Sequence, residues 1–388
     1  MSVTAAKGFT AAGVKAGLKA SGNHDVALVL NEGPEFVAAG VFTSNRFKAA
    51  PVLWSLQVLA DHELKAVVLN SGGANACTGP EGFADTHHTA EYVATVLASR
   101  GTQFGAGEIA VCSTGLIGER LPMDKICAGI DGAVAELSVD GGDNAALAIM
   151  TTDSVPKKSV GPGNGFVVGG MAKGAGMLAP GLATMLVVIT TDAMVDADLA
   201  DAALRQATGM SFDRIDSDGC MSTNDTVLLL ASGASGVRPS ADEFTATLTA
   251  VCSDLALQLI HDAEGASKDI KIVVEQAVTV DDALEVARAI ARSNLLKCAL
   301  HGEDPNWGRV LAAAGTTSAH FDPDQVDVAM NGIWICRGGG LGEDRSLVSL
   351  AARQIEINVV LRAGTSEATV WTNDLTADYV HENSAYST

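Results

Sequence analysis

Short apolar runs rich in β-branched residues recur along the chain, separated by polar and glycine-containing stretches. Runs of about four to eight such residues are typical of buried β-strands, because branched side chains pack well on a pleated surface. They are far shorter than the roughly 20 apolar residues that a membrane-spanning helix needs. The pattern predicts strands over residues 26–30, 66–69, 185–189, 226–230, 270–274 and 355–361.

Helical periodicity lies between several of these runs. The clearest pattern follows Ser240 and Glu243, which have the spacing of a capping box at the start of a helix. Two further helices are predicted, around 93–97 and from 282 to about 296. The apolar face of the first helix consists of Phe244, Leu248, Val251, Leu255 and Leu259.

Strands that alternate with helices predict an α/β fold. The strands 354–361 and 367–373 follow each other closely enough to pair antiparallel, so we expect mixed sheets. The stretch 154–165 is rich in Pro, Gly and Lys and is predicted to be a mobile loop. Three nearby acidic residues lack the remaining ligands of a calcium loop and are expected to form a solvated turn: Asp213, Asp216 and Asp218.

Composition narrows the classes of function. The 388 residues include 46 Asp and Glu against 25 Lys and Arg, for a formal net charge of −21. Such a charge repels phosphate backbones and anionic lipids, so we expect neither nucleic acid nor membrane partners. The opening residues lack a secretory signal, and the scattered cysteines show no CxxC spacing. We therefore expect a cytoplasmic protein without a metal site.

The segment 173–192 carries the most specific chemistry: a glycine-rich turn, the pair Pro180-Gly181, then Ala183, Thr184 and an apolar strand. A hydroxyl after a small residue and a tight turn suits an intramolecular N-to-O acyl shift. Cleavage would free the α-amino group of Thr184, which has an ordinary pKa of about 8 and can serve as base for the hydroxyl of the same residue. By itself the pattern also fits an ordinary threonine at the start of a strand.

The sequence KGAGMLAPGLATML resembles the cleavage site of the ornithine acetyltransferase family, also called glutamate N-acetyltransferases. The resemblance puts the cut between Ala183 and Thr184. Gly73, Gly181 and Cys220 depart from the usual family pattern without touching that threonine. Further blocks resemble the family in the same order along the chain: NSGGANACTG (70–79), CSTGLIG (112–118), STNDT (222–226), GEDPNWGR (302–309) and the C-terminal ENSAYST.

The resemblance implies a precursor that cuts itself into residues 1–183 and 184–388. It implies an N-terminal-nucleophile-like α/β fold with stacked mixed sheets flanked by helices. The implied reaction is a ping-pong transfer of acetyl from N2-acetylornithine to glutamate through acetyl-Thr184, in arginine biosynthesis. No tightly bound cofactor is implied, and whether acetyl-CoA also donates acetyl stays open. The two-chain unit is expected to form a homo-oligomer.

The resemblance also assigns roles around the nucleophile. Thr114 and Gly115 resemble the family's oxyanion hole, although a Ser-Thr-Gly run is otherwise an ordinary turn. Lys173 resembles the residue that meets the substrate carboxylate, where composition alone suggests a solvated lysine. Glu264 resembles the carboxylate that holds the ornithine amino group, and its ordinary alternative is a residue that ends a helix before Gly265.

Three more positions complete the implied site. Thr151 resembles a substrate contact and is favoured over its neighbour Thr152. Asn383 and Thr388 lie in a tail that would ordinarily fray, but the family implies a tail folded back into the site.

Two other functions remain open from the sequence. The first is an aminopeptidase or amidase on the same self-cleaving scaffold, with water in place of glutamate. The second is a metabolite-binding protein that uses the glycine runs 338–342 and 161–165, which lack the strand-then-helix setting of a phosphate loop. Lys173 and Glu264 suit amino-acid substrates and favour the transferase.

Overall fold

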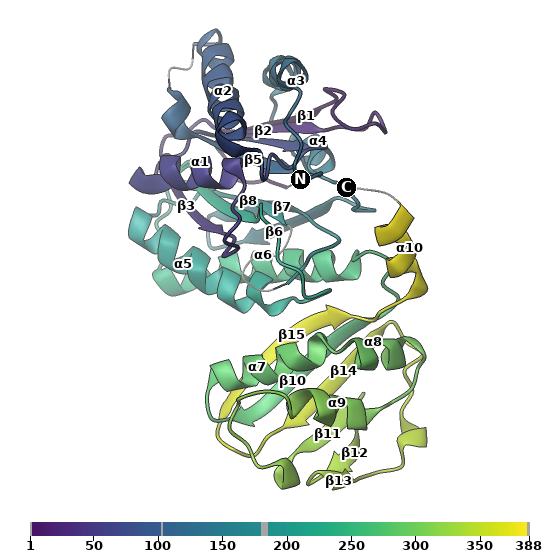
Figure 1. Ribbon diagram of the computed structural model, residues 1–388. Helices are drawn as coiled ribbons and strands as arrows, with labels where there is room; N and C mark the ends of the chain where they lie inside the picture. Colours follow the sequence, from purple (N-terminus) through teal and green to yellow (C-terminus); the bar gives the residue numbers. More distant parts are fainter. Residues whose placement is uncertain (1, 102–103, 180–184, 386–388) are drawn as a thin grey trace.

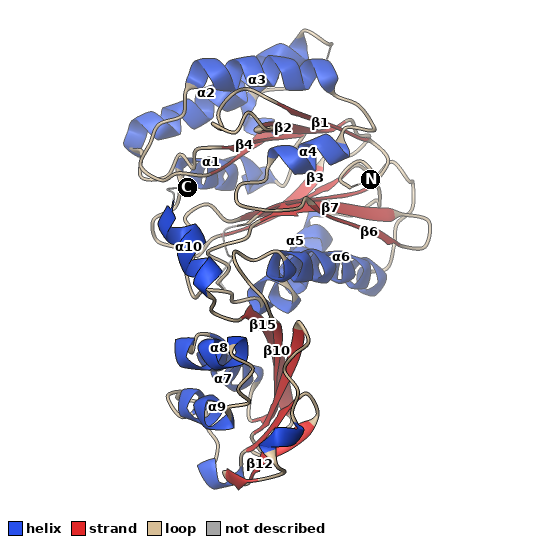
Figure 2. Cartoon of the chain, turned by 90° about the vertical axis from the view of Figure 1, so that its right-hand side faces the viewer, coloured by secondary structure: helices blue, strands red, loops and turns tan. Residues whose placement is uncertain are grey.

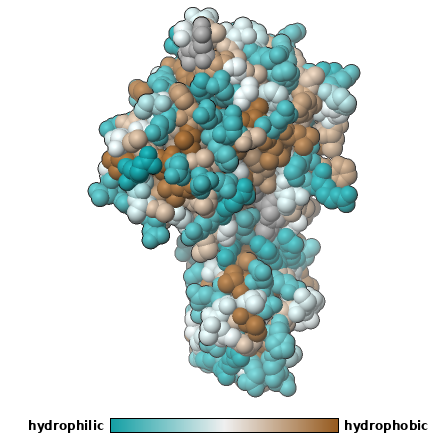
Figure 3. Space-filling view, turned by 90° about the vertical axis from the view of Figure 1, so that its left-hand side faces the viewer, coloured by the Kyte–Doolittle hydropathy of each residue, from teal (hydrophilic) through white to brown (hydrophobic). Residues whose placement is uncertain are grey.

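A computed structural model describes residues 2–101, 104–179 and 185–385 of the chain (Figure 1). It shows a body of two stacked sheets and, below it in this view, a smaller domain built on a third sheet. The hydrophobic residues visible in Figure 3 gather mainly on the two-sheet body. None of the helices within these ranges is both long and apolar enough to cross a membrane.

The first sheet has the strand order β1-β2-β4-β5, in which only the β4–β5 pair is parallel. Every residue of its strands is buried, and β2 and β4 accordingly read as apolar runs in the sequence. The strands are β1 (Phe9–Val14), β2 (Val26–Asn31), β4 (Ala66–Ser71) and β5 (Ile109–Thr114). The helices around them are α1 (Ala50–Val58), α2 (Gly79–Ala98), α3 (Met123–Glu136) and α4 (Gly142–Ala148).

The second sheet has the order β3-β9-β8-β7-β6, with β8 and β9 parallel and the other neighbours antiparallel. Figure 2 shows the two sheets stacked between an upper layer of α2 and α3 and a lower layer of α5 and α6. The strands are β3 (Val37–Phe42), β6 (Lys157–Pro162), β7 (Val167–Lys173), β8 (Leu186–Thr191) and β9 (Thr226–Ala231), and the helices are α5 (Ala197–Met210) and α6 (Ala241–His261).

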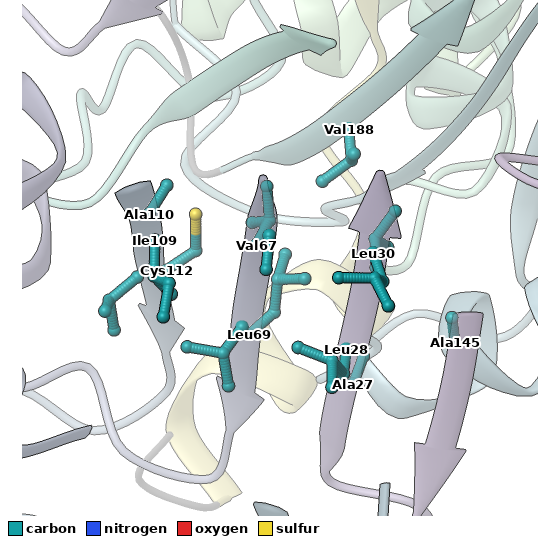
Figure 4. Packing of buried hydrophobic residues seen from close by; sticks show 14 of the residues in the cluster. Ala27, Leu28, Leu30, Val67, Leu69, Ile109, Ala110, Cys112, Ala145 and Val188 are labelled. Atoms are coloured by element: carbon teal, nitrogen blue, oxygen red, sulfur yellow. The ribbon is translucent and has the colours of Figure 1, made fainter. Parts of the chain in front are cut away.

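One hydrophobic core joins the facing surfaces of the two sheets. Figure 4 shows Val188 of β8 facing Leu30 and Val67 of the first sheet. Each such side chain stabilises the fold by about 1.5–3 kcal/mol relative to its exposure to water. The predicted α/β class with stacked mixed sheets flanked by helices is confirmed.

The third sheet has the order β13-β12-β11-β14-β10-β15 and its own core. Its helices are α7 (Val280–Ala291), α8 (Asn294–His301) and α9 (Trp307–Ala314), and α10 (Ala377–Ala385) returns to the body (Figure 1). Its strands are β10 (Asp269–Ala277), β11 (Asp327–Met330), β12 (Ile333–Arg337), β13 (Gly340–Leu341), β14 (Gln354–Val360) and β15 (Ser366–Asn373). Short 3-10 turns lie at Leu59–Asp61, Ala106–Glu108, Phe212–Arg214, Pro323–Gln325 and Arg345–Leu347.

Two predictions about this domain were wrong. Strands β14 and β15 do not pair with each other, because β10 lies between them, parallel to β14 and antiparallel to β15. The link between them donates backbone hydrogen bonds to Glu275 and Gln276 at the end of β10 and so passes around that strand. The single helix predicted over 282–296 is two helices, since the Ser293 side chain accepts from the Leu296 N–H and begins α8 anew.

Two loop predictions also fail. The stretch 154–165 contains β6, an edge strand held to α6 by Gln258, whose amide bonds both backbone groups of Lys158. Asp216 is fully buried rather than solvated, and its Oδ2 accepts from Arg292 Nε at 2.7 Å. The sequence pattern did not indicate that Gln258 contacts Lys158 or that Arg292 contacts Asp216.

Candidate active site

A cavity of about 120 Å³ opens where the ends of β5 and β7 meet the loops before β9 and after α6. It brings together all the sequence-predicted site residues that the structure describes, from five separate segments. Thr184, Ala183 and Thr388 lie outside the described residues. The predicted residues that line the cavity are Thr114, Gly115, Thr151, Lys173, Glu264 and Asn383.

The Thr114–Gly115 turn at the end of β5 has a conformation that requires glycine. Gly115 has φ +129°, and a Cβ there would lie 2.6 Å from the backbone nitrogen of Gly73. The Gly73 N–H donates to the Thr114 carbonyl at 3.0 Å. Since the carbonyl and the N–H of a trans peptide point in opposite directions, the Gly115 N–H is directed away from Gly73.

Asn224 holds this turn from the opposite sheet. Its Nδ2 donates to the carbonyls of Ser113 at 2.8 Å and of Ala74 at 2.6 Å. The Ser113 hydroxyl in turn donates to Asn70 Oδ1 at 2.6 Å. These buried bonds fix the peptide planes on both sides of Thr114, which is the preorganisation that an oxyanion site needs.

Lys173 lies at the end of β7, where it pairs in register with Leu186 of β8. Its side chain is buried, and its Nζ donates to Thr114 Oγ1 at 3.1 Å. Because the Thr114 oxygen accepts this bond, the hydroxyl proton is directed elsewhere and can be donated. Burial lowers the pKa of Lys173, although nearby carboxylates, Asp153 first among them, oppose the shift. Lys173 is therefore not a solvated surface lysine.

Glu264 and Asn383 meet on the outer side of the cavity. Asn383 Nδ2, on α10, donates to Glu264 Oε2 at 2.9 Å. The Glu264 N–H donates to the carbonyl of Ala175 at 2.9 Å, which ties this segment to the glycine-rich turn after β7. A Cβ on Gly265 would lie 2.2 Å from the Tyr379 nitrogen, so this glycine lets the tail approach. Figure 2 shows α10 lying alongside the body.

Thr151 and Thr152 both line the cavity, so the choice between them stays a prediction. The Thr151 N–H donates to Asp153 Oδ2 at 2.9 Å. Burial alone would raise the pKa of Asp153, but Lys173, Lys157 and the Gly174 N–H together hold it below its ordinary value. A buried charged cluster therefore lies directly behind this loop.

Sequence reasoning did not single out Asn224 or Asp225, although both lie in the STNDT block. Asp225 is fully buried, and its Oδ1 accepts the Met185 N–H at 3.1 Å, one residue after Thr184. Its Oδ2 has no hydrogen-bond partner among the described residues. Burial raises the pKa of Asp225 well above its ordinary value. The sequence feature that could have indicated them is that Asn224 and Asp225 directly precede the buried strand β9.

Known proteins resemble the chain over nearly its whole length. The model of the ArgJ family matches residues 10–388. The arginine biosynthesis bifunctional protein ArgJ of Streptomyces avermitilis is 67% identical, covering 100% of both chains, and that of Mycobacterium leprae is 57% identical, covering 99% of this chain and 95% of its own. A solved ornithine acetyltransferase of Mycobacterium tuberculosis, complexed with ornithine, is 60% identical over 48% of this chain and 96% of its own, with a TM-score of 0.44.

Proposed function

This chain belongs to the ArgJ family, and from that premise we propose that it transfers acetyl from N2-acetylornithine to glutamate in arginine biosynthesis. The observation that carries the proposal is the single cavity in which the six described candidate residues converge. Family membership over residues 10–388 favours this transfer over the hydrolytic alternative. The reaction would release ornithine and form N-acetylglutamate, without a tightly bound cofactor. Use of acetyl-CoA as a further donor belongs to the same proposal.

The proposed nucleophile is the hydroxyl of Thr184, freed by cleavage after Ala183. Its own α-amino group takes the hydroxyl proton while the oxygen attacks the acetyl carbon. The carbonyl oxygen becomes an oxyanion, which the Gly115 N–H and the Thr114 hydroxyl stabilise. The C–N bond to ornithine then breaks, and the departing amine takes the proton. The α-amine of glutamate attacks acetyl-Thr184 and reverses these steps.

The charges around the cavity support amino-acid substrates. Lys173 would face a substrate carboxylate, and Glu264 would bind the side-chain ammonium of ornithine by a charge-assisted hydrogen bond. Asn383 holds the Glu264 carboxylate from the tail, and Thr151 would complete the substrate contacts. Thr388, at the end of the same tail, is the remaining proposed contact.

The mature enzyme would consist of residues 1–183 and 184–388, and the two-chain unit would assemble into a homo-oligomer in the cytoplasm. The Asp225 carboxyl group supports the self-cleavage step, because its Oδ1 accepts the Met185 N–H at 3.1 Å and so fixes the backbone just after the proposed new N-terminus. Cleavage is needed for transfer, since an amide nitrogen on Thr184 is not a base.

A denaturing mass spectrum tests the proposal. Active protein should consist of the fragments 1–183 and 184–388, and incubation with acetylornithine without glutamate should add one acetyl group to the second fragment. Thr184→Ala should remain a single inactive chain. Thr190→Ala is the matched control, because Thr190 lies on β8 with its hydroxyl bonded to the Val3 carbonyl, and it should still be cleaved. An uncut wild-type chain that transfers acetyl would contradict the mechanism.

A further inference from the structure

Lys157, the first residue of β6, carries a completely buried ammonium group behind the cavity. Its Nζ lies 2.5 Å from Asp153 Oδ1 and 2.5 Å from Asp262 Oδ2. The two carboxylates are themselves 0% and 8% exposed. Burial of three charged groups, of which only Lys157 lies on the edge strand β6, costs free energy, and solubility does not require it. The hydrogen bonds that Asp153 and Asp262 accept indicate the role of this cluster.

Asp153 holds the inner part of the cavity. Its Oδ2 accepts the Thr151 N–H at 2.9 Å, and its Oδ1 accepts the Gly174 N–H at 2.7 Å. Gly174 directly follows Lys173. The Asp153 carboxylate therefore fixes two cavity-lining segments, the Thr151 loop and the end of β7, relative to each other.

Asp262 holds the outer part. It ends α6 and lies two residues before Glu264. Its Oδ2 accepts the Ser154 N–H at 2.9 Å, and its Oδ1 accepts from the Ser154 hydroxyl. The Glu264 segment is thus tied to the residues after Thr151, and the ammonium of Lys157 joins it to Asp153.

We infer that Lys157 is a positioning residue that sets the spacing between the Lys173 end and the Glu264 end of the cavity, and thereby selects substrates by chain length. The inference rests on the proposed function. Without the ammonium, two buried carboxylates would face each other and repel, and the two ends of the cavity would no longer be held at one separation. A site of fixed length discriminates against one extra methylene by about 10–200-fold.

The test compares acetyl transfer from N2-acetylornithine and from N2-acetyllysine, which is one methylene longer, in Lys157→Met and in Asp262→Asn. In both variants, kcat/KM for acetylornithine divided by kcat/KM for acetyllysine should fall by about tenfold or more. The cavity would then accommodate the extra methylene that the wild type rejects. Lys158→Met is the matched control: Lys158 is the next residue of β6, and it pairs with Asp143 at the surface. Its ratio should equal that of the wild type.

Asp262→Asn keeps the shape of the side chain and leaves Lys157 paired with Asp153, so it decides the question if Lys157→Met does not fold. A folded, self-cleaved variant with an unchanged ratio overturns the positioning role while the proposed function stands. A wild type that transfers no acetyl from acetylornithine removes the proposed function, and the length selection falls with it.

Discussion

The two ends of the cavity are built differently. The inner wall, made of Thr114, Gly115 and Lys173, is enclosed by the two-sheet body: Thr114 is 2% exposed and Lys173 is 1% exposed. The outer wall consists of Glu264, which is half-buried, and Asn383, which is exposed. Fixed dipoles in a dry setting are worth most where charge develops in the transition state. A wetter wall is sufficient to recognise the far end of a substrate. Changes to the inner wall should therefore cost more than changes to the outer wall.

Among changes to the two walls, Gly115→Ala should cause the largest loss of activity. The new Cβ would lie 2.6 Å from the Gly73 nitrogen at a φ of +129°, so the turn must move and the N–H with it. Loss of such a donor should lower kcat by about 10²–10³-fold with little change in KM. Gly132→Ala, whose Cβ would meet only ordinary contacts near 3.8 Å, should leave the kinetics unchanged. Equal kinetics for both variants would remove the turn from the mechanism.

Lys173→Met should lower kcat/KM by about 10²-fold, or about 2.7 kcal/mol, while self-cleavage still goes to completion. The lost ammonium also held the Thr114 oxygen, so both recognition and charge stabilisation suffer. Because burial lowers the pKa of Lys173, the wild type should lose activity with rising pH earlier than an ordinary lysine would allow. Rate profiles of both proteins against pH check this, and an identical alkaline limb in the variant would assign that limb to another group.

Glu264→Gln should raise KM for acetylornithine by about tenfold with kcat nearly unchanged, because water screens a half-buried carboxylate. The acceptor half-reaction should respond less, since glutamate lacks the side-chain ammonium. Steady-state kinetics with each substrate varied in turn measure both effects. A drop confined to kcat would place Glu264 in the chemistry rather than in recognition.

Asn383→Ala should have the smallest effect, about a threefold rise in KM, as expected for one exposed hydrogen bond. If the amide acts only by holding Glu264 Oε2, the double variant with Glu264→Gln should be no worse than Glu264→Gln alone. Additive losses would show that Asn383 contacts substrate directly.

The sequence predicted four strands of the two-sheet body, β2, β4, β8 and β9, because they are buried and read as apolar runs rich in β-branched residues. Strands β1, β3, β5 and β7 were not predicted, since small or hydroxyl residues interrupt their apolar runs. The strands predicted at 26–30 and 226–230 are found at Val26–Asn31 and Thr226–Ala231. The edge strand β6 was missed because its Pro, Gly and Lys residues resemble a loop. Hydrophobic periodicity does not indicate the order of strands in a sheet. The position of β10 between β14 and β15 could therefore not be predicted.

The candidate residues of the site came from family resemblance, and their convergence on one cavity could not be read from residue spacing. No feature of the sequence indicated the buried cluster of Lys157, Asp153 and Asp262. Lys157 lies in a stretch that looks solvated, and its partner Asp262 is 105 positions away. Only the folded chain reveals that the lysine is buried.

The strand order of the second sheet has a consequence for how the protein must be made. β3, β7 and β6 precede Thr184 in the chain, whereas β9 and β8 follow it and lie between β3 and β7. A break before Thr184 would therefore leave a nick inside one continuous sheet, with its two pieces interleaved. Synthesised separately, the first piece would expose β3 and β7 as open edges, which invite pairing with other chains and aggregation. The peptide bond must then be intact while the sheet forms, and its loss afterwards releases nothing.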